Sequence, residues 1–128
     1  MPAPASLPAS HFVISRKQTT FVAKYLAMSY ERKIINDPVF GFINIPKGLL
    51  YDIVRHPLLQ RLTRIKQLGL SSVVYPGAQH TRFQHSLGAF YLMSEAIQQL
   101  TAKGNFIFDS EAEAVQAAIL MHDIGHGP

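Results

Sequence analysis

The sequence predicts a mainly α-helical protein with a small β-hairpin at its amino-terminal side. Apolar residues recur at the three-and-four spacing of an amphipathic helix in residues 49–68, 81–103 and 110–123. Residues 33–46 instead place β-branched and aromatic residues on both sides of a turn signal. A chain of 128 residues that is 48% apolar is long enough to bury one core of ordinary size.

The composition excludes several kinds of site. No cysteine is present, so neither a disulfide nor a thiolate metal site can form, and a reducing compartment is favoured. No apolar run approaches the ~18 residues of a membrane span, so we expect a soluble, cytoplasmic protein with no membrane partner. The net charge of +4 belongs to residues 1–33, because residues 34–128 carry seven basic and seven acidic side chains. Basicity of the globular part is therefore no argument for nucleic-acid binding.

Residues 1–32 are predicted to be a basic, poorly ordered extension. The first 30 residues contain three prolines and no acid. Such a composition is also found in transit-type presequences, and a third interpretation is that translation begins at Met28. We favour the poorly ordered arm or the start at Met28 over a presequence.

In residues 33–46, Asn36-Asp37-Pro38 is the turn signal between the two expected strands. Residues 49–68 predict a helix that Pro57 divides in two, with His56 extended before it. The basic side chains of this segment are more simply a solvated face than a phosphate-binding surface. They are Arg55, Arg61, Arg64 and Lys66.

Residues 69–80 predict a loop in which 73–75 are briefly extended. Helical spacing returns in residues 81–103, where His85 lies beside the apolar stripe and Arg82 lies one turn earlier on the same side. The stripe consists of Phe83, Leu87, Phe90, Tyr91, Ser94, Ile97 and Leu100.

The last predicted helix begins at a capping box, with Ser110 as the N-cap and Glu113 as its partner. His122 and Asp123 end this helix before two glycines. An imidazole and a carboxylate at a buried helix end suit a divalent metal, although an ordinary polar helix end is the alternative. The residues expected to face the core are Ala114, Val115, Ala118, Ile119 and Met121.

Two antiparallel helices can bring His85 and His122 onto one metal. With this arrangement the sequence resembles the HD-domain metal-dependent phosphohydrolases, and most closely their deoxynucleoside triphosphate (dNTP) triphosphohydrolase branch, which contains the bacterial dGTP triphosphohydrolases. The similar blocks are Lys33-Ile34-Ile35-Asn36-Asp37-Pro38-Val39, Arg61-Leu62, Ile65-Lys66-Gln67-Leu68-Gly69, Tyr75-Pro76-Gly77-Ala78, Arg82-Phe83-Gln84-His85-Ser86-Leu87-Gly88 and His122-Asp123-Ile124-Gly125-His126-Gly127-Pro128.

The resemblance implies an HD-domain helical core, of which residues 33–128 would be the amino-terminal part. It implies one divalent metal (Mn, Fe, Ni, Co or Zn, with Mg as a further candidate) held by His85, His122, Asp123 and a later aspartate. The last block ends the sequence, so we expect a truncated chain that binds metal weakly and is inactive alone.

The resemblance also assigns the substrate contacts. Arg82 and His126 match catalytic positions that face the phosphates, and Gln67 and Leu68 match positions near the nucleotide sugar. An arginine gives a planar fork of donors to a phosphate, and an imidazole can transfer a proton near neutral pH.

A regulatory guanine-nucleotide site of one branch would include Lys33 and Asn36. The aspartate and arginine of that site are replaced here by Arg55 and Thr63. Because Arg55 inverts the charge that meets the guanine, regulation through this site is not expected.

The expected function is therefore metal-dependent hydrolysis of nucleotides, with a dNTP as the substrate and a homo-oligomer as the full-length form. The alternative is a non-catalytic module that binds a nucleotide or single-stranded nucleic acid on the same helices. Hydrolysis of a cyclic dinucleotide is a third hypothesis, which leaves the match at Gln67 and Leu68 without a purpose.

Overall fold

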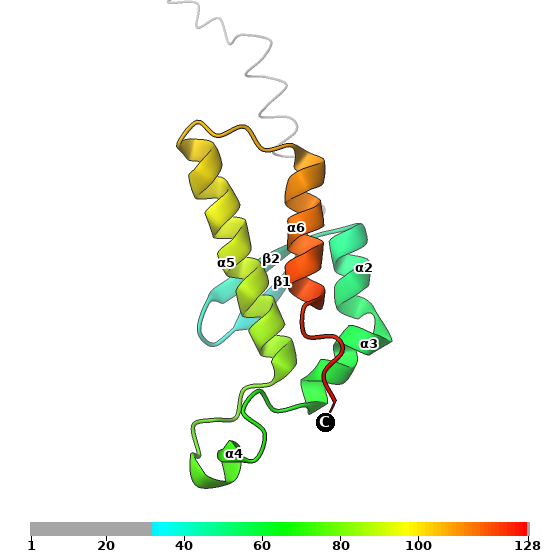
Figure 1. Ribbon diagram of the computed structural model, residues 1–128, viewed down its shortest axis with the longest axis vertical. Helices are drawn as coiled ribbons and strands as arrows, with labels where there is room; N and C mark the ends of the chain where they lie inside the picture. The colour runs from blue at the N-terminus through cyan, green and yellow to red at the C-terminus, as the bar shows by residue number, and fades with distance from the viewer. Residues whose placement is uncertain (1–31, 128) are drawn as a thin grey trace, which may run out of the picture. The chain divides into compact units, whose positions relative to one another are not determined.

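The computed structural model describes residues 32–127, which belong to the compact unit Glu31–Pro128. This part is mainly helical, and an antiparallel hairpin precedes the helices, as predicted (Figure 1). The predicted basic extension lies outside the described residues, except that Arg32 already belongs to the first strand. The elements are β1 (Arg32–Asp37), β2 (Gly41–Pro46), α2 (Leu49–Arg55), α3 (Pro57–Gln60), the 3-10 helix η1 (Arg61–Arg64), α4 (Ser71–Val74), α5 (Arg82–Ala102) and α6 (Asp109–Met121).

The side chain of Asp37 closes the turn between β1 and β2. Its Oδ1 accepts the backbone N–H of Val39 at 2.8 Å and that of Phe40 at 3.0 Å, as in an Asx-turn. The hairpin contributes Ile43 and Ile45 to the core, where both are fully buried.

Pro57 divides the next segment as predicted, and His56 before it is extended (φ −61°, ψ 135°). The prediction that helix continues to Leu68 is wrong. After η1 the chain instead joins an isolated β-bridge, and the N–H of Arg82 donates to the carbonyl of Ile65 at 2.9 Å. This long-range pairing replaces the local hydrogen bonds of a helix.

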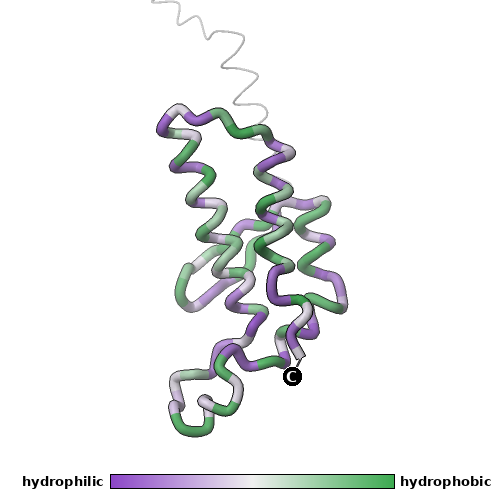
Figure 2. Tube along the Cα trace, in the orientation of Figure 1, coloured by the Kyte–Doolittle hydropathy of each residue, from purple (hydrophilic) through white to green (hydrophobic). Residues whose placement is uncertain are grey.

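Residues 71–74 form one helical turn, α4, where the sequence predicts a short extended stretch at 73–75. The N–H of Tyr75 donates to the carbonyl of Ser71 at 2.8 Å, so this backbone hydrogen bond forms within the turn and needs no partner strand. Leu70 and Val73 remain 86% and 79% exposed, and the hydrophobic colour of this segment is visible in Figure 2.

Helix α5 begins at a capping box that fixes its first turn. The N–H of Gln84 donates to Oγ1 of Thr81, and the N–H of Thr81 donates to Oε1 of Gln84 at 2.9 Å. Two turns later, Gly88 lies under the ring of Phe40, which also packs against Tyr91 with ring centroids 5.1 Å apart. The hairpin is therefore seated directly on α5.

Helix α6 starts earlier than predicted, because the N–H of Phe108 donates to Oε2 of Glu111 at 3.1 Å. The predicted capping pair Ser110 and Glu113 is therefore wrong by two residues. The predicted core face is also wrong, because Ala117 and Leu120 are the buried residues of α6. Of the residues predicted to face the core, Ile119 is half-buried, and the exposed ones are Ala114, Val115, Ala118 and Met121.

Helix α6 packs between α5 and α2, and this position explains which of its faces is buried. One cluster of apolar side chains joins the hairpin to all the longer helices. Within residues 32–127 no helix is both long and apolar enough to cross a membrane. The cluster consists of Ile43, Ile45, Leu50, Val54, Leu59, Leu62, Ile65, Leu87, Phe90, Ala117 and Leu120.

Candidate metal centre

The start of α5 and the end of α6 lie together, because the two helices are adjacent and antiparallel (Figure 1). Helix α5 supplies His85, and the turn after α6 supplies His122 and Asp123. One ligand atom from each of the three residues lies within 4.8 Å of the other two. The structure thus brings together the three residues that the sequence predicts as metal ligands.

The spacing of these atoms fits a metal ion. Donor atoms bound to one ion at about 2.0–2.2 Å lie about 2.8–3.6 Å apart when they subtend about 90–109° at the metal. Nε2 of His122 lies 3.2 Å from Nε2 of His85 and 3.5 Å from Oδ1 of Asp123. Both separations are those of neighbouring ligands, and the donor atoms of His85 and Asp123 lie within 4.8 Å of each other, so the three side chains form a group that an ion could draw together.

The ring of His122 is held in the tautomer that binds a metal. Its Nδ1 lies 2.6 Å from the carbonyl oxygen of Ile119, which can only accept a hydrogen bond. The proton of a neutral ring therefore resides on Nδ1, and Nε2 keeps its lone pair. A hydrogen bond of this kind on the far ring nitrogen is common for histidine ligands and fixes the orientation of the ring.

Asp123 is the buried centre of a small polar network, with 11% of its side chain exposed. Nη1 of Arg82 lies 3.1 Å from Oδ2, and Nε2 of His126 lies 3.5 Å from Oδ1. The two predicted phosphate-facing residues therefore both contact the same carboxylate. His126 is 52% exposed, whereas only 18% of Arg82 is exposed.

Arg61 also reaches this corner, and the sequence analysis missed its role by assigning it to a solvated face. Its Nη2 donates to the carbonyl of Ile124 at 2.9 Å and to that of His126 at 2.7 Å. The separation of 63 residues from Ile124 left no local signal, because only the fold brings these groups together.

Gln67 and Leu68 lie next to the start of α5, since the N–H of Gln67 donates to the carbonyl of His80 at 3.0 Å. Oε1 of Gln67 is buried and accepts no hydrogen bond from the described residues. Leu68 is 52% exposed. The predicted regulatory residues Lys33 and Asn36 are exposed on β1 and do not belong to the metal-ligand group.

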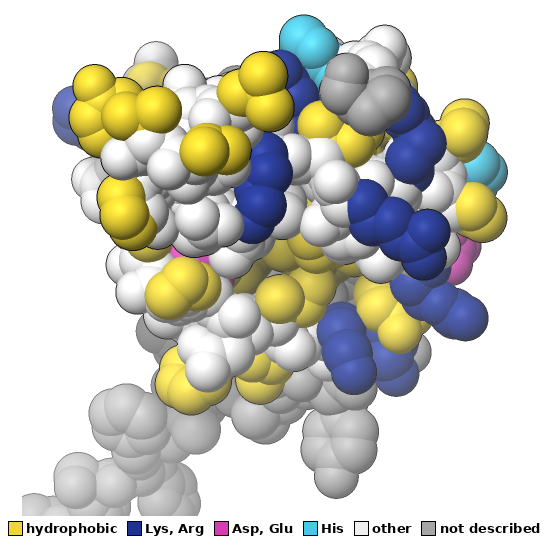
Figure 3. All heavy atoms as spheres, turned by 90° about the horizontal axis from the view of Figure 1, so that it is seen from below, with side chains coloured by type: hydrophobic (Ala, Val, Ile, Leu, Met, Phe, Trp, Pro, Cys, Tyr) yellow, Lys and Arg dark blue, Asp and Glu magenta, His cyan; other side chains and the backbone are white. Residues whose placement is uncertain are grey.

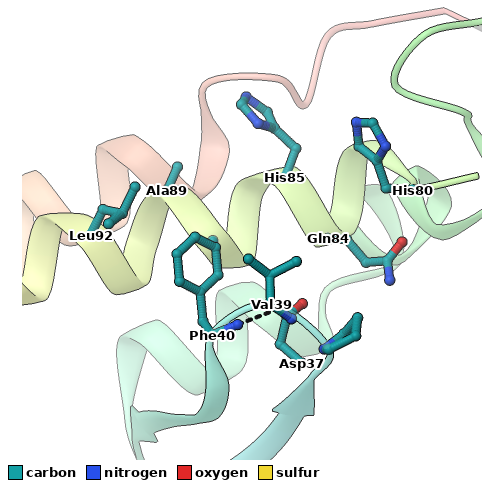
Figure 4. A pocket seen from close by; sticks show the side chains of 10 residues that line it. Asp37, Val39, Phe40, His80, Gln84, His85, Ala89 and Leu92 are labelled. Carbon is teal, nitrogen blue, oxygen red and sulfur yellow. Dashed lines mark hydrogen bonds between the residues drawn. The ribbon is translucent and has the colours of Figure 1, made fainter. Parts of the chain in front are cut away.

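A cavity of about 300 Å³ lies between the hairpin turn and the start of α5 (Figure 4). His85 borders it, but its ring points away from Val39 and Phe40. Lys and Arg side chains gather on the end of the folded unit seen in Figure 3. The cavity is lined by Asp37, Pro38, Val39, Phe40, His80, Gln84, His85, Gly88, Ala89 and Leu92.

Comparisons with known proteins support an HD-type phosphohydrolase region over about 98 residues of this chain. The deoxynucleoside triphosphate triphosphohydrolase SAMHD1 of Homo sapiens is 47% identical over 98 residues, covering 75% of this chain and 16% of that protein. The uncharacterized protein YwfO of Bacillus subtilis is 39% identical, covering 77% of this chain and 23% of that protein. No family model matches the sequence.

Solved structures support the same assignment. A phosphohydrolase of Bacteroides thetaiotaomicron is 96% identical with a TM-score of 0.75, covering 77% of this chain and 24% of that chain. A hypothetical protein of Aquifex aeolicus is 38% identical with a TM-score of 0.65, covering 76% of this chain and 24% of that chain. The chain therefore spans about a quarter or less of the length of these relatives.

Proposed function

We propose that this chain is part of a metal-dependent dNTP triphosphohydrolase built on an HD-domain helical core. The observation that carries the proposal is the convergence of His85, His122 and Asp123, whose donor atoms lie within 4.8 Å of one another. When bound, a divalent metal supplies a Lewis acid for a phosphate oxygen and activates water. Mn, Fe, Ni, Co and Zn all accept two imidazoles and a carboxylate, and Mg is a weaker candidate because it prefers oxygen.

Arg82 binds the phosphates of the substrate in this proposal. One arm of its guanidinium is held by Asp123, while its Nε is buried and has no partner among the described residues. A buried N–H without an acceptor costs about 1–3 kcal/mol, and a phosphate oxygen would remove that cost. The ion pair with Asp123 orients the planar fork before the substrate arrives.

His126 holds a phosphate oxygen or transfers a proton in the same corner. Its ring is exposed, and its Nε2 lies 3.5 Å from Oδ1 of Asp123, so the ring is accessible to a substrate beside the ligand carboxylate. Gln67 offers its unpaired buried Oε1 to a sugar hydroxyl, and the exposed side chain of Leu68 offers apolar contact to the sugar ring.

The binding-module alternative is less well supported, because its basic set is already partly occupied. Arg61 donates to two backbone carbonyls, and Nζ of Lys66 donates to the carbonyl and to Oε1 of Gln79. The guanidinium of Arg55 lies 5.5 Å from the centre of the Tyr51 ring. Only Arg64 in this set is exposed without such a contact in residues 32–127.

The test is hydrolysis of dGTP by the full-length protein with added Mn²⁺, followed as release of inorganic triphosphate, together with the metal bound per chain. We expect His85→Ala and Asp123→Ala to lose both metal and turnover. His80→Ala removes an exposed histidine outside the ligand group and is the matched control.

Metal-independent turnover, or turnover that survives His85→Ala, would contradict the proposed centre. Nucleotide binding that falls steeply with salt and never leads to hydrolysis would favour the binding module instead.

A further inference from the structure

The longest-range hydrogen bonds at the metal centre are made by Arg61 and go to backbone carbonyls. Arg61, at the start of η1, donates both hydrogens of Nη2 to the chain after α6. The acceptors are the carbonyls of Ile124 and His126. They lie on either side of Gly125 and just after Asp123, so the guanidinium bridges the segment that carries the ligand carboxylate.

Apart from Arg61, this segment is held by Ile124, which packs against the apolar core, and by the ion pair of Asp123 with Arg82. Its backbone is closed by two turn hydrogen bonds, from Ile124 N–H to the carbonyl of Met121 and from His126 N–H to the carbonyl of Asp123. Gly125 and Gly127 flank His126 and are both exposed. A glycine-rich turn has high conformational freedom, so an additional clamp on its carbonyls restricts the positions available to Asp123.

The chemistry suits an arginine at this place. The carbonyls of Ile124 and His126 lie beyond Met121, the last residue of α6, so the hydrogen bonds of the helix do not satisfy them. A guanidinium can meet two such acceptors at once in a fixed plane, which an ammonium on a flexible stem does less well. Arg82 restrains the same turn through the Asp123 carboxylate, so the turn is held from two sides.

We propose that Arg61 is a positioning residue of the metal centre: it fixes the Asp123–His126 turn and so sets the position of the Asp123 carboxylate. The inference rests on the proposed function for the presence of a metal. The restraint that Arg61 places on the turn does not depend on the proposed function. Groups that orient metal ligands typically change metal affinity by about 10–100-fold when removed.

The experiment uses the full chain with three variants. Arg61→Ala removes the clamp, Arg61→Lys keeps the charge without the fork, and Arg64→Ala removes the neighbouring exposed arginine as a matched control. Co²⁺ binding is followed by its visible absorption spectrum, and amide hydrogen exchange is measured on the metal-free protein at Ile124 and His126. Thermal melting reports any general loss of stability.

We expect Arg61→Ala to weaken Co²⁺ binding by about tenfold or more and to alter the spectrum at saturation. Exchange at the two amides should accelerate about tenfold or more, while amides in the middle of α5 stay unchanged. Arg61→Lys should lie between the wild type and Arg61→Ala, and Arg64→Ala should match the wild type.

Unchanged exchange at both amides in Arg61→Ala would overturn the inference. A lowered melting temperature with an unaltered cobalt spectrum would also overturn it, because Arg61 would then be merely structural. If the wild type binds no cobalt, the proposed function is contradicted, whereas faster exchange in Arg61→Ala would still support the hold on the turn.

Discussion

Helix α5 makes two contacts of opposite character within three turns. Toward the hairpin and the core it forms an apolar seam, where Phe40 lies against Gly88 and Phe90 is buried in the core cluster. Toward the end of α6 it forms a polar corner, where His85 is exposed and Arg82 pairs with Asp123. The size of each group is critical in the seam, whereas the identity and orientation of each donor atom are critical in the corner.

The largest effect is expected in the seam, from Phe90→Ala. Phe90 is 1% exposed, and removing a buried aromatic ring costs about 3–5 kcal/mol through lost burial and the cavity that remains. Urea unfolding would measure the loss. The same truncation at Leu92, which is 56% exposed two residues later, should cost much less. Equal losses at the two sites would show that the seam is not closely packed.

Gly88→Ala should destabilise the protein by about 1–3 kcal/mol, even though alanine is the better helix former. A Cβ atom built at Gly88 would lie 2.6 Å from Cε2 of Phe40, so the ring or the hairpin must move. Gly77→Ala is the control, because nothing lies within 4 Å of a Cβ atom there. If Phe40→Leu does not relieve the loss, the clash is not its cause.

Thr81→Ala should have a smaller effect, which falls on both the stability of the protein and the metal centre. It removes the cap of α5, which is worth about 0.5–2 kcal/mol, and it frees the turn that precedes His85. We expect a slightly lower unfolding free energy together with weaker metal binding. Thr81→Ser keeps the hydroxyl and should restore both properties; a variant that recovers only one of them would separate the cap from the metal centre.

His85→Ala should have the smallest effect on the metal-free protein, within about 0.5 kcal/mol, because the residue is exposed. The two proteins should differ in stability once metal is added. Metal at 100 times its dissociation constant should stabilise the wild type by about 2.7 kcal/mol and leave His85→Ala unchanged. Chemical unfolding with and without Mn²⁺ measures both quantities. Equal stabilisation of the two proteins would place the metal elsewhere.

The sequence predicted those elements that are determined by residues close to them in the chain. The hairpin follows from the turn at Asp37, the break between α2 and α3 follows from Pro57, and the long helix follows from its apolar stripe. The proximity of His85 to the end of α6 could be anticipated because antiparallel helices return the chain to the same end.

The features that were mispredicted depend on distant partners. The buried face of α6 is decided by its place between α5 and α2, which puts Ala117 rather than Val115 inside. The helix expected to reach Leu68 stops because Ile65 pairs with Arg82. The contacts of Arg61 could not be read from the sequence, since neither carbonyl that it binds carries a side-chain signature.

The hydrogen bond from His122 to Ile119 also limits where the chain can change in length. Each residue of an α-helix advances the next side chain by about 100° and about 1.5 Å. One residue inserted after Ala117 would turn the His122 ring out of phase with His85, although the packing of the first turns of α6 would be intact. An insertion in the exposed loop at residues 103–106 would leave the phase of both helices unchanged. Insertions and deletions should therefore be tolerated at the far end of α5 and α6, and excluded from the last turn before the metal centre.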